Sequence, residues 1–261
     1  MTLLWILAAT FLGGALSAAL ASAFLLLRDA ERAWLLPHLI SFATGAMLAA
    51  ALVGLLPEAM ASVGIQHIQG IGAAVLAGIG LFFILEKLVL WRHCHTDDCE
   101  THAPHETQRD RAAAWIVLFG TGVHNAFDGV LIAAAFLTDL KLGVMTTIAI
   151  TAHEVPQELG DLAVLLHAGM SARRALWFNL ASSLTSILGG LAGYLALRGS
   201  LVILPYAISV AAASLIYVAV ADLIPGLHRR TELRATVSQT VLIALGIGSI
   251  ALARVLLGDL Q

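Results

Sequence analysis

Two short stretches in the middle of the chain place imidazole and carboxylate side chains inside otherwise apolar sequence. They read His124-Asn125-Ala126-Phe127-Asp128-Gly129 and His153-Glu154-Val155-Pro156-Gln157-Glu158-Leu159-Gly160-Asp161. Each stretch lies about halfway along an apolar run that is long enough to cross a membrane. An ionisable side chain at that depth costs roughly 2.5–3.5 kcal/mol to insert, so such a cluster indicates a functional site. Metal binding is the leading hypothesis for its chemistry.

The spacing within each stretch predicts which side chains point the same way. Residues four apart share one face of a helix, so His124 and Asp128 lie on one side, with Asn125 beside them. The second helix carries two neighbouring stripes, of which one holds His153, Gln157 and Asp161 and the other holds Glu154 and Glu158. Because a short turn joins these consecutive helices, we expect them to pack antiparallel and to build one polar site.

The residue types in this site favour a first-row divalent ion. Neutral imidazole suits Zn²⁺, carboxylates neutralise its charge, and the amides of Asn125 and Gln157 are weak oxygen donors. The donors predict Zn²⁺ or a neighbour such as Fe²⁺, Mn²⁺ or Cd²⁺. A structural zinc site would use thiolates in a closed tetrahedron, whereas mixed ligands allow release. Pro156 also frees the carbonyl of Ala152 at this level of the helix.

Composition places these motifs in a membrane protein. The 261 residues are 59% hydrophobic and 12% charged, and the mean hydropathy is +0.90, which excludes an ordinary soluble protein. A membrane-spanning helix takes about 20 residues. Eight apolar windows are that long: Leu3–Leu27, Leu36–Leu56, Ile68–Leu90, Ala112–Phe136, Gly143–His167, Leu176–Leu197, Leu201–Ile224 and Thr236–Leu257.

The basic residues predict how these helices are oriented. Eight crossings place both termini on one side of the membrane. The face opposite the termini holds Arg28, Arg32, Lys87, Arg92, Arg109, Arg111, Arg173, Arg174, Arg229, Arg230 and Arg234, and the other face holds Lys141, Arg198 and Arg254. Cytoplasmic loops are enriched in Lys and Arg, so both termini are predicted to lie outside the cytoplasm. We expect an integral protein of a bacterial inner (plasma) membrane.

Residues 45–57 and 213–225 form a weak internal repeat. Both segments end on Leu-Leu-Pro or Leu-Ile-Pro, and by the predicted topology they run in opposite directions. Inverted repeats of this kind occur in secondary transporters, with the site at the midplane between the halves. Similar apolar composition would produce the same match without a repeat, so both interpretations stay open.

The longest loop, residues 91–111, is rich in side chains that bind metals. It contains His93, Cys94, His95, Cys99, His102 and His105, and its position on the predicted cytoplasmic side argues against a disulfide. A transient metal sink and a solvated loop with incidental histidines are both consistent with this composition.

At the two central stretches the chain resembles the ZIP family of divalent metal transporters. The first is similar to that family's His-Asn-x-x-Asp-Gly motif, through His124, Asn125, Asp128 and Gly129. The second resembles its His-Glu-x-Pro-His-Glu-x-Gly-Asp motif, matched by His153, Glu154, Pro156, Glu158, Gly160 and Asp161. The likeness extends to eight helices, external termini and the His-bearing loop. Gln157 departs from the motif, because a second His is common there.

The resemblance implies a two-metal centre and uptake of Zn²⁺ into the cytoplasm by alternating access. It implies one ion held by His124, His153, Glu154 and Gln157, and another held by His124, Asn125, Asp128, His153 and Gln157. Met47 matches a thioether ligand position only loosely, and packing explains a Met there equally well. Family members commonly dimerise, so a homodimer is expected. We expect no organic cofactor and no nucleic-acid partner.

Other functions would use some of the same residues. An intramembrane metalloprotease would use His153-Glu154 as the start of an H-E-x-x-H motif, but Gln157 stands where the second His is required. A membrane metal sensor or a proton-coupled carrier would use the same ionisable residues without metal flux. We predict that the chain is not an enzyme. The fold expected is an all-α polytopic membrane protein, one transporter domain over residues 1–261 with eight helices and inverted halves around the fourth and fifth.

Overall fold

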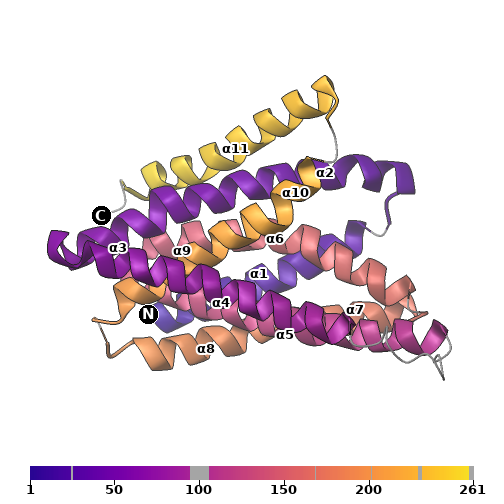
Figure 1. The fold of residues 1–261 in the computed structure, drawn as a ribbon, viewed down its shortest axis with the longest axis horizontal. Helices are drawn as coiled ribbons and strands as arrows, with labels where there is room; N and C mark the ends of the chain where they lie inside the picture. Colours follow the sequence, from indigo (N-terminus) through magenta and orange to yellow (C-terminus); the bar gives the residue numbers. More distant parts are fainter. Residues whose placement is uncertain (25, 95–105, 168, 201, 229–230, 259–261) are drawn as a thin grey trace.

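The computed structural model describes residues 1–24, 26–94, 106–167, 169–200, 202–228 and 231–258, which are helical with short connections and contain no strand. Figure 1 shows the helices lying roughly side by side in one bundle. Their bounds are α1 Thr2–Phe24, α2 Asp29–Ala49, η1 Ala50–Leu55, α3 Leu56–Val63, η2 Ile65–His67, α4 Ile68–Cys94, α5 Glu106–Thr138, α6 Leu140–His167, α7 Ala172–Ser183, α8 Thr185–Leu197, α9 Leu204–Tyr217, η3 Val218–Leu223, α10 Ile224–Leu227 and α11 Leu233–Gly258.

Each predicted apolar window overlaps a helix or helices joined end to end. Six segments of the described chain are long and apolar enough to cross a membrane: Thr2–Ala23, Trp34–Val63, Ile65–Leu85, Ala172–Leu197, Leu204–Leu227 and Leu233–Leu256. Helices α5 and α6 stand apart from these six because they carry the two polar stretches. The predicted class, an all-α polytopic membrane protein, is confirmed.

The helices pack in pairs that correspond between the two halves of the chain. Helix α2 packs along α11, and α9 packs along α4. In the same way α1 packs on α6, and α8 packs on α5, while α5 and α6 contact each other at the centre. Two halves related by an inverted repeat produce such corresponding pairs, in which a helix of one half packs on a helix of the other. The arrangement encloses α5 and α6 between the two halves.

The two segments of the sequence repeat share a local distortion. Residues 50–55 and 218–223 are both π-helical, and both are followed by a proline near the start of the next α-helical segment. A proline has no N–H for the carbonyl four residues earlier, so the backbone changes its hydrogen-bond register there. Pro57 therefore leaves the carbonyl of Val53 free, and the guanidinium of Arg254 on α11 donates to it.

Close backbone contacts at glycines hold α5 against α8. A Cβ built on Gly189 would lie 1.8 Å from the carbonyl oxygen of Ala126, and one built on Gly129 would lie 1.9 Å from that of Ser186. Only glycine permits this approach, as is common where membrane helices pack tightly. The α5–α8 interface therefore fixes the helix that carries the first polar stretch.

The outer surface of the bundle is apolar. Large side chains such as Leu76 on α4, Leu188 on α8 and Val255 on α11 are each more than 60% exposed, as expected for side chains that face lipid. Helix α1 begins and α11 ends at the same end of the bundle (Figure 1). This arrangement agrees with the predicted even number of crossings.

Candidate metal centre

Four of the predicted ligands meet at the contact between α5 and α6. His124 and Asp128 come from α5, one turn apart, and His153 and Glu154 are consecutive on α6. Each offers one nitrogen or oxygen atom, and these atoms all lie within 4.8 Å of one another. The side chains are buried, except that His124 is 22% exposed. The site therefore lies inside the protein with one edge open.

The distances between these atoms are those of a coordination shell. The Nε2 atoms of His124 and His153 lie 3.3 Å apart. Oδ2 of Asp128 lies 3.6 Å from Nε2 of His124 and 3.4 Å from Nε2 of His153. Oε1 of Glu154 lies at the same two distances, 3.6 Å from Nε2 of His124 and 3.4 Å from Nε2 of His153. Ligands about 2.1 Å from a tetrahedral zinc ion are separated from each other by about 3.4 Å. The four donors are thus spaced to hold one small divalent cation.

The hydrogen bonding of the cluster supports the same conclusion. Oδ2 of Asp128 and Oε1 of Glu154 are buried and accept no hydrogen bond from the described residues. Nδ1 of His153 lies 3.4 Å from the carbonyl oxygen of Ala149, where a ring N–H donates to the backbone and leaves Nε2 as a ligand. Two buried carboxylate oxygens without donors need a positive charge between them, and the imidazoles converge on that point.

No hydrogen bond within the described residues joins the other three predicted ligands, Asn125, Gln157 and Met47, to this cluster. Asn125 is 1% exposed, and neither its amide nitrogen nor its amide oxygen has a hydrogen-bond partner among the described residues. Gln157 is half-buried, one turn beyond His153. Met47, on α2, is fully buried within the apolar core. Their roles as ligands stay predictions.

Glu158 faces away from the two histidines, into a separate polar contact between α1, α6 and α7. It is fully buried and accepts hydrogen bonds from the hydroxyls of Ser17 and Ser183 and from the amide of Asn179. These three partners lie 141, 25 and 21 residues away in the sequence. Sequence analysis missed them, because isolated Ser and Asn residues in apolar helices carry no distinguishing pattern.

Asp161 makes a second link between α5 and α6. Its carboxylate accepts a hydrogen bond of 2.6 Å from the hydroxyl of Thr121. Thr121 precedes His124 by three residues, so this pair lies one turn from the cluster, toward the end of the bundle where α5 begins. The spacing from Thr121 to Asn125 places the threonine on the polar face of α5, a signal from which it could have been predicted.

Comparison with known proteins shows the family to which the chain belongs. Residues 91–254 match the ZIP zinc transporter family. Over 236 residues the chain is 30% identical to zinc transporter ZIP13 of Pongo abelii, covering 85% of this chain and 68% of that protein. The chain belongs to the ZIP family. Its match to zinc transporter ZIP10 of Homo sapiens is 38% over 141 residues, 52% of this chain and 17% of that protein.

The chain spans only about a fifth of the length of several relatives. It covers 22% of zinc transporter foi of Drosophila melanogaster, to which it is 35% identical over 161 residues, or 61% of this chain. All of these named relatives are animal proteins. The family consists of transporters and not of enzymes, so the prediction that the chain is not an enzyme is confirmed.

Most of the loop that is rich in His and Cys lies outside the described residues. Residues 95–105, which include His95, Cys99, His102 and His105, lie outside the described residues. Helix α4 ends at Cys94, and α5 begins at Glu106.

Proposed function

We propose that this ZIP protein carries divalent metal ions, Zn²⁺ foremost, across a membrane through the cluster between α5 and α6. The observation that carries the proposal is the spacing of 3.3–3.6 Å among two imidazole nitrogens and two carboxylate oxygens that accept no hydrogen bond. The relatives named as zinc transporters support Zn²⁺ as the ion. Fe²⁺, Mn²⁺ and Cd²⁺ suit the same donors.

The direction proposed is toward the cytoplasm, by alternating exposure of the cluster to the two sides. Basic residues gather at the end of the bundle where α2, α7 and α11 begin, which the positive-inside rule assigns to the cytoplasm, and the termini are then external. An ion leaving the cluster inward would next meet the Asp161–Thr121 pair. The membrane we propose is a bacterial inner membrane.

The remaining ligand assignments form part of the same proposal. Asn125, whose amide is buried without a partner, and Gln157 would complete the shell of a second ion beside the first. Met47 would contribute a thioether from α2, and Glu158 and Asp161 would offer carboxylate oxygens to the ion on the inner side of His153. We further propose that residues 1–261 act as one transporter domain, with the loop at residues 91–111 in the cytoplasm, and that the protein works as a homodimer.

The test is ion uptake by proteoliposomes that contain the purified protein. His153→Ala removes a nitrogen that lies within 3.4 Å of three other donor atoms, so saturable Zn²⁺ uptake should be lost while the protein stays folded in detergent. His67→Ala makes the same change at an exposed position outside the cluster and should leave uptake unchanged.

Three outcomes separate the competing functions. Loss of uptake in the His153 variant alone supports transport through the cluster. Full uptake by that variant would remove the permeation site from α5 and α6. Zinc binding by the wild-type protein without any flux would favour a sensor. Running the assay with Zn²⁺, Fe²⁺, Mn²⁺ and Cd²⁺ ranks the ions.

A further inference from the structure

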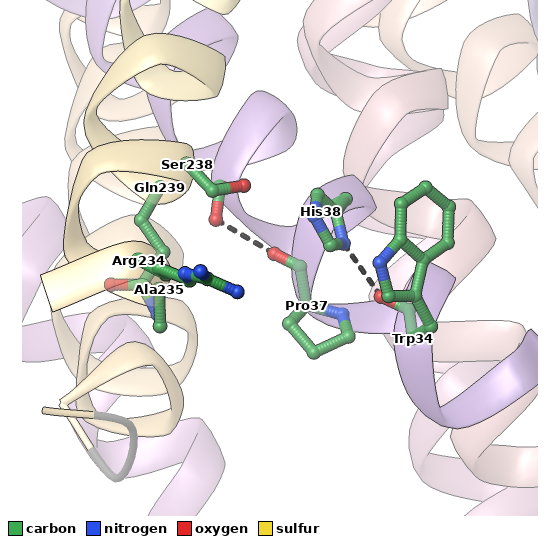
Figure 2. A pocket seen from close by; sticks show the side chains of 8 residues that line it. Trp34, Pro37, His38, Arg234, Ala235, Ser238 and Gln239 are labelled. Carbon is green, nitrogen blue, oxygen red and sulfur yellow. Dashed lines mark hydrogen bonds between the residues drawn. The ribbon is translucent and has the colours of Figure 1, made fainter. Parts of the chain in front are cut away.

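A polar hollow lies between the first turns of α11 and the N-terminal part of α2, well away from the metal cluster. Its volume is about 230 Å³. The side chains from α2 and from α11 face each other across it (Figure 2). The residues that line it are Trp34, Pro37, His38, Ser41, Arg234, Ala235, Ser238 and Gln239.

The hollow offers donors and no negative charge. None of its lining residues is acidic. Ser41 donates to the carbonyl of Pro37, and Gln239 donates to that of Leu227, so these two side chains are already engaged. Within the described part of the chain, the guanidinium of Arg234 and the hydroxyl of Ser238 have no such partner. A cavity with an unpaired guanidinium and a free hydroxyl donor is suited to an anion.

The side of the hollow formed by Trp34 and His38 also offers a hydrogen-bond donor. Nδ1 of His38 lies 2.6 Å from the carbonyl oxygen of Trp34, and the two rings are in contact, tilted by 34° with centroids 4.4 Å apart. This contact fixes both rings against α2. Trp34 is nevertheless 63% exposed, and its indole N–H has no partner among the described residues. The indole therefore reaches out of the protein on the opposite side of the hollow from Arg234 (Figure 2).

The hollow lies at the boundary of the membrane. The apolar span of α2 begins at Trp34, and that of α11 begins at Leu233, so both walls of the hollow stand where hydrocarbon gives way to lipid headgroups. Trp is enriched at this level of membrane proteins. In the sequence, Arg229 and Arg230 precede Arg234 by five and four residues. A ligand entering the hollow would therefore come from the headgroup layer.

We infer that this hollow binds the phosphate of an anionic phospholipid from the leaflet on the side where α2 and α11 begin. The guanidinium of Arg234 pairs with the phosphate, and the hydroxyl of Ser238 and the indole of Trp34 donate to its remaining oxygens. The volume of about 230 Å³ holds a phosphodiester group together with several water molecules of about 30 Å³ each.

The experiment measures association of spin-labelled phosphatidylglycerol with the purified full-length protein in phosphatidylcholine nanodiscs. The fraction of immobilised label gives a relative association constant. Arg234→Gln should weaken association about fivefold, the effect of one basic residue at a membrane surface. Arg28→Gln removes the same charge at the same end of the bundle but outside the hollow, where Arg28 already pairs with Glu31, and it should change association by much less.

A second variant tests the cavity without changing charge. Ala235→Leu places a larger side chain in the hollow and should also weaken association, with the helical content and melting temperature unchanged. Equal effects of Arg234→Gln and Arg28→Gln, or no effect of Ala235→Leu, would overturn the site. Displacement of the labelled lipid from the wild-type protein by inorganic phosphate would show a site for free phosphate and would overturn the lipid assignment.

Discussion

Replacing Gly189 by alanine tests whether the close contact of α8 with α5 holds the metal cluster together. A Cβ at this position would lie 1.8 Å from the carbonyl oxygen of Ala126. Ordinary contact requires about 3.4 Å, so the two helices must separate locally by about 1.6 Å. A backbone carbonyl has no alternative rotamer, and therefore the strain cannot be relieved by a side-chain rotation.

The expected cost follows from this geometry. Overpacking a tight interface costs about 1–3 kcal/mol, and a contact with rigid backbone places Gly189→Ala near the upper value. For a chain of this size, about 3 kcal/mol corresponds to a fall in melting temperature of about 6–12 °C. Ala126 lies between His124 and Asp128 on α5, so the displacement also moves both side chains relative to His153 on α6.

The assay is thermal unfolding in detergent with and without Zn²⁺. A ligand that binds only the folded state at about 100 times its Kd adds about 2.7 kcal/mol to its stability, so the wild-type protein should show a clear rise in melting temperature with Zn²⁺. The Gly189→Ala variant should have a lower melting temperature without Zn²⁺, and Zn²⁺ should raise that temperature by less than in the wild-type protein. Gly248→Ala is the matched control, because a Cβ there meets nothing within 4 Å. It should leave the melting temperatures with and without Zn²⁺ unchanged or slightly higher. Equal melting temperatures for the two variants would refute the reasoning.

Three further substitutions and one deletion address the site and its surroundings. Gln157→His adds a nitrogen ligand and should tighten Zn²⁺ binding and shift preference from Fe²⁺ and Mn²⁺ toward Zn²⁺ in competition titrations; an unchanged metal profile would show that Gln157 does not touch the ion. Glu158→Leu leaves the buried amide of Asn179 and the hydroxyls of Ser17 and Ser183 without their acceptor and should lower stability by about 1–3 kcal/mol. Glu158→Gln keeps an acceptor oxygen and should cost less in the same unfolding measurement, and the reverse order would contradict this account. Deleting residues 93–105 should leave initial-rate Zn²⁺ uptake measurable at matched expression, and complete loss with an intact fold would place the loop in the permeation route.

Helix order and class were accessible from the sequence because both depend on local properties. Apolar runs of about 20 residues predict membrane spans without any knowledge of their neighbours. Each predicted window overlaps described helix, although the second helical region begins at Asp29 and continues to Val63, beyond the window Leu36–Leu56. Polar residues such as Asp29 and Glu58 lie outside this window but inside the helices, so an apolar window does not mark where a helix begins and ends.

The core of the cluster was also predictable, since helical periodicity relates residues of the same helix. His124 and Asp128 are one turn apart, and a short turn makes α5 and α6 antiparallel neighbours, so His153 was expected opposite them. Which carboxylate on α6 joins the histidines was not determined, because Glu154 and Glu158 are themselves one turn apart. The packed structure brings Glu154 to the histidines, while Glu158 meets α1 and α7.

Some features are set only by tertiary structure, because they depend on residues far apart in the sequence. The hydroxyl of Ser17 reaches Glu158 across 141 positions, and the guanidinium of Arg254 reaches the carbonyl of Val53 across 201. The hollow between α2 and α11 likewise exists only once these two helices pack together. The sequence alone therefore determined that two polar stretches lie at membrane depth and what ion they suit. Tertiary packing decided which oxygens surround that ion, because helices of similar apolar composition are distinguished only by the detailed fit of their surfaces.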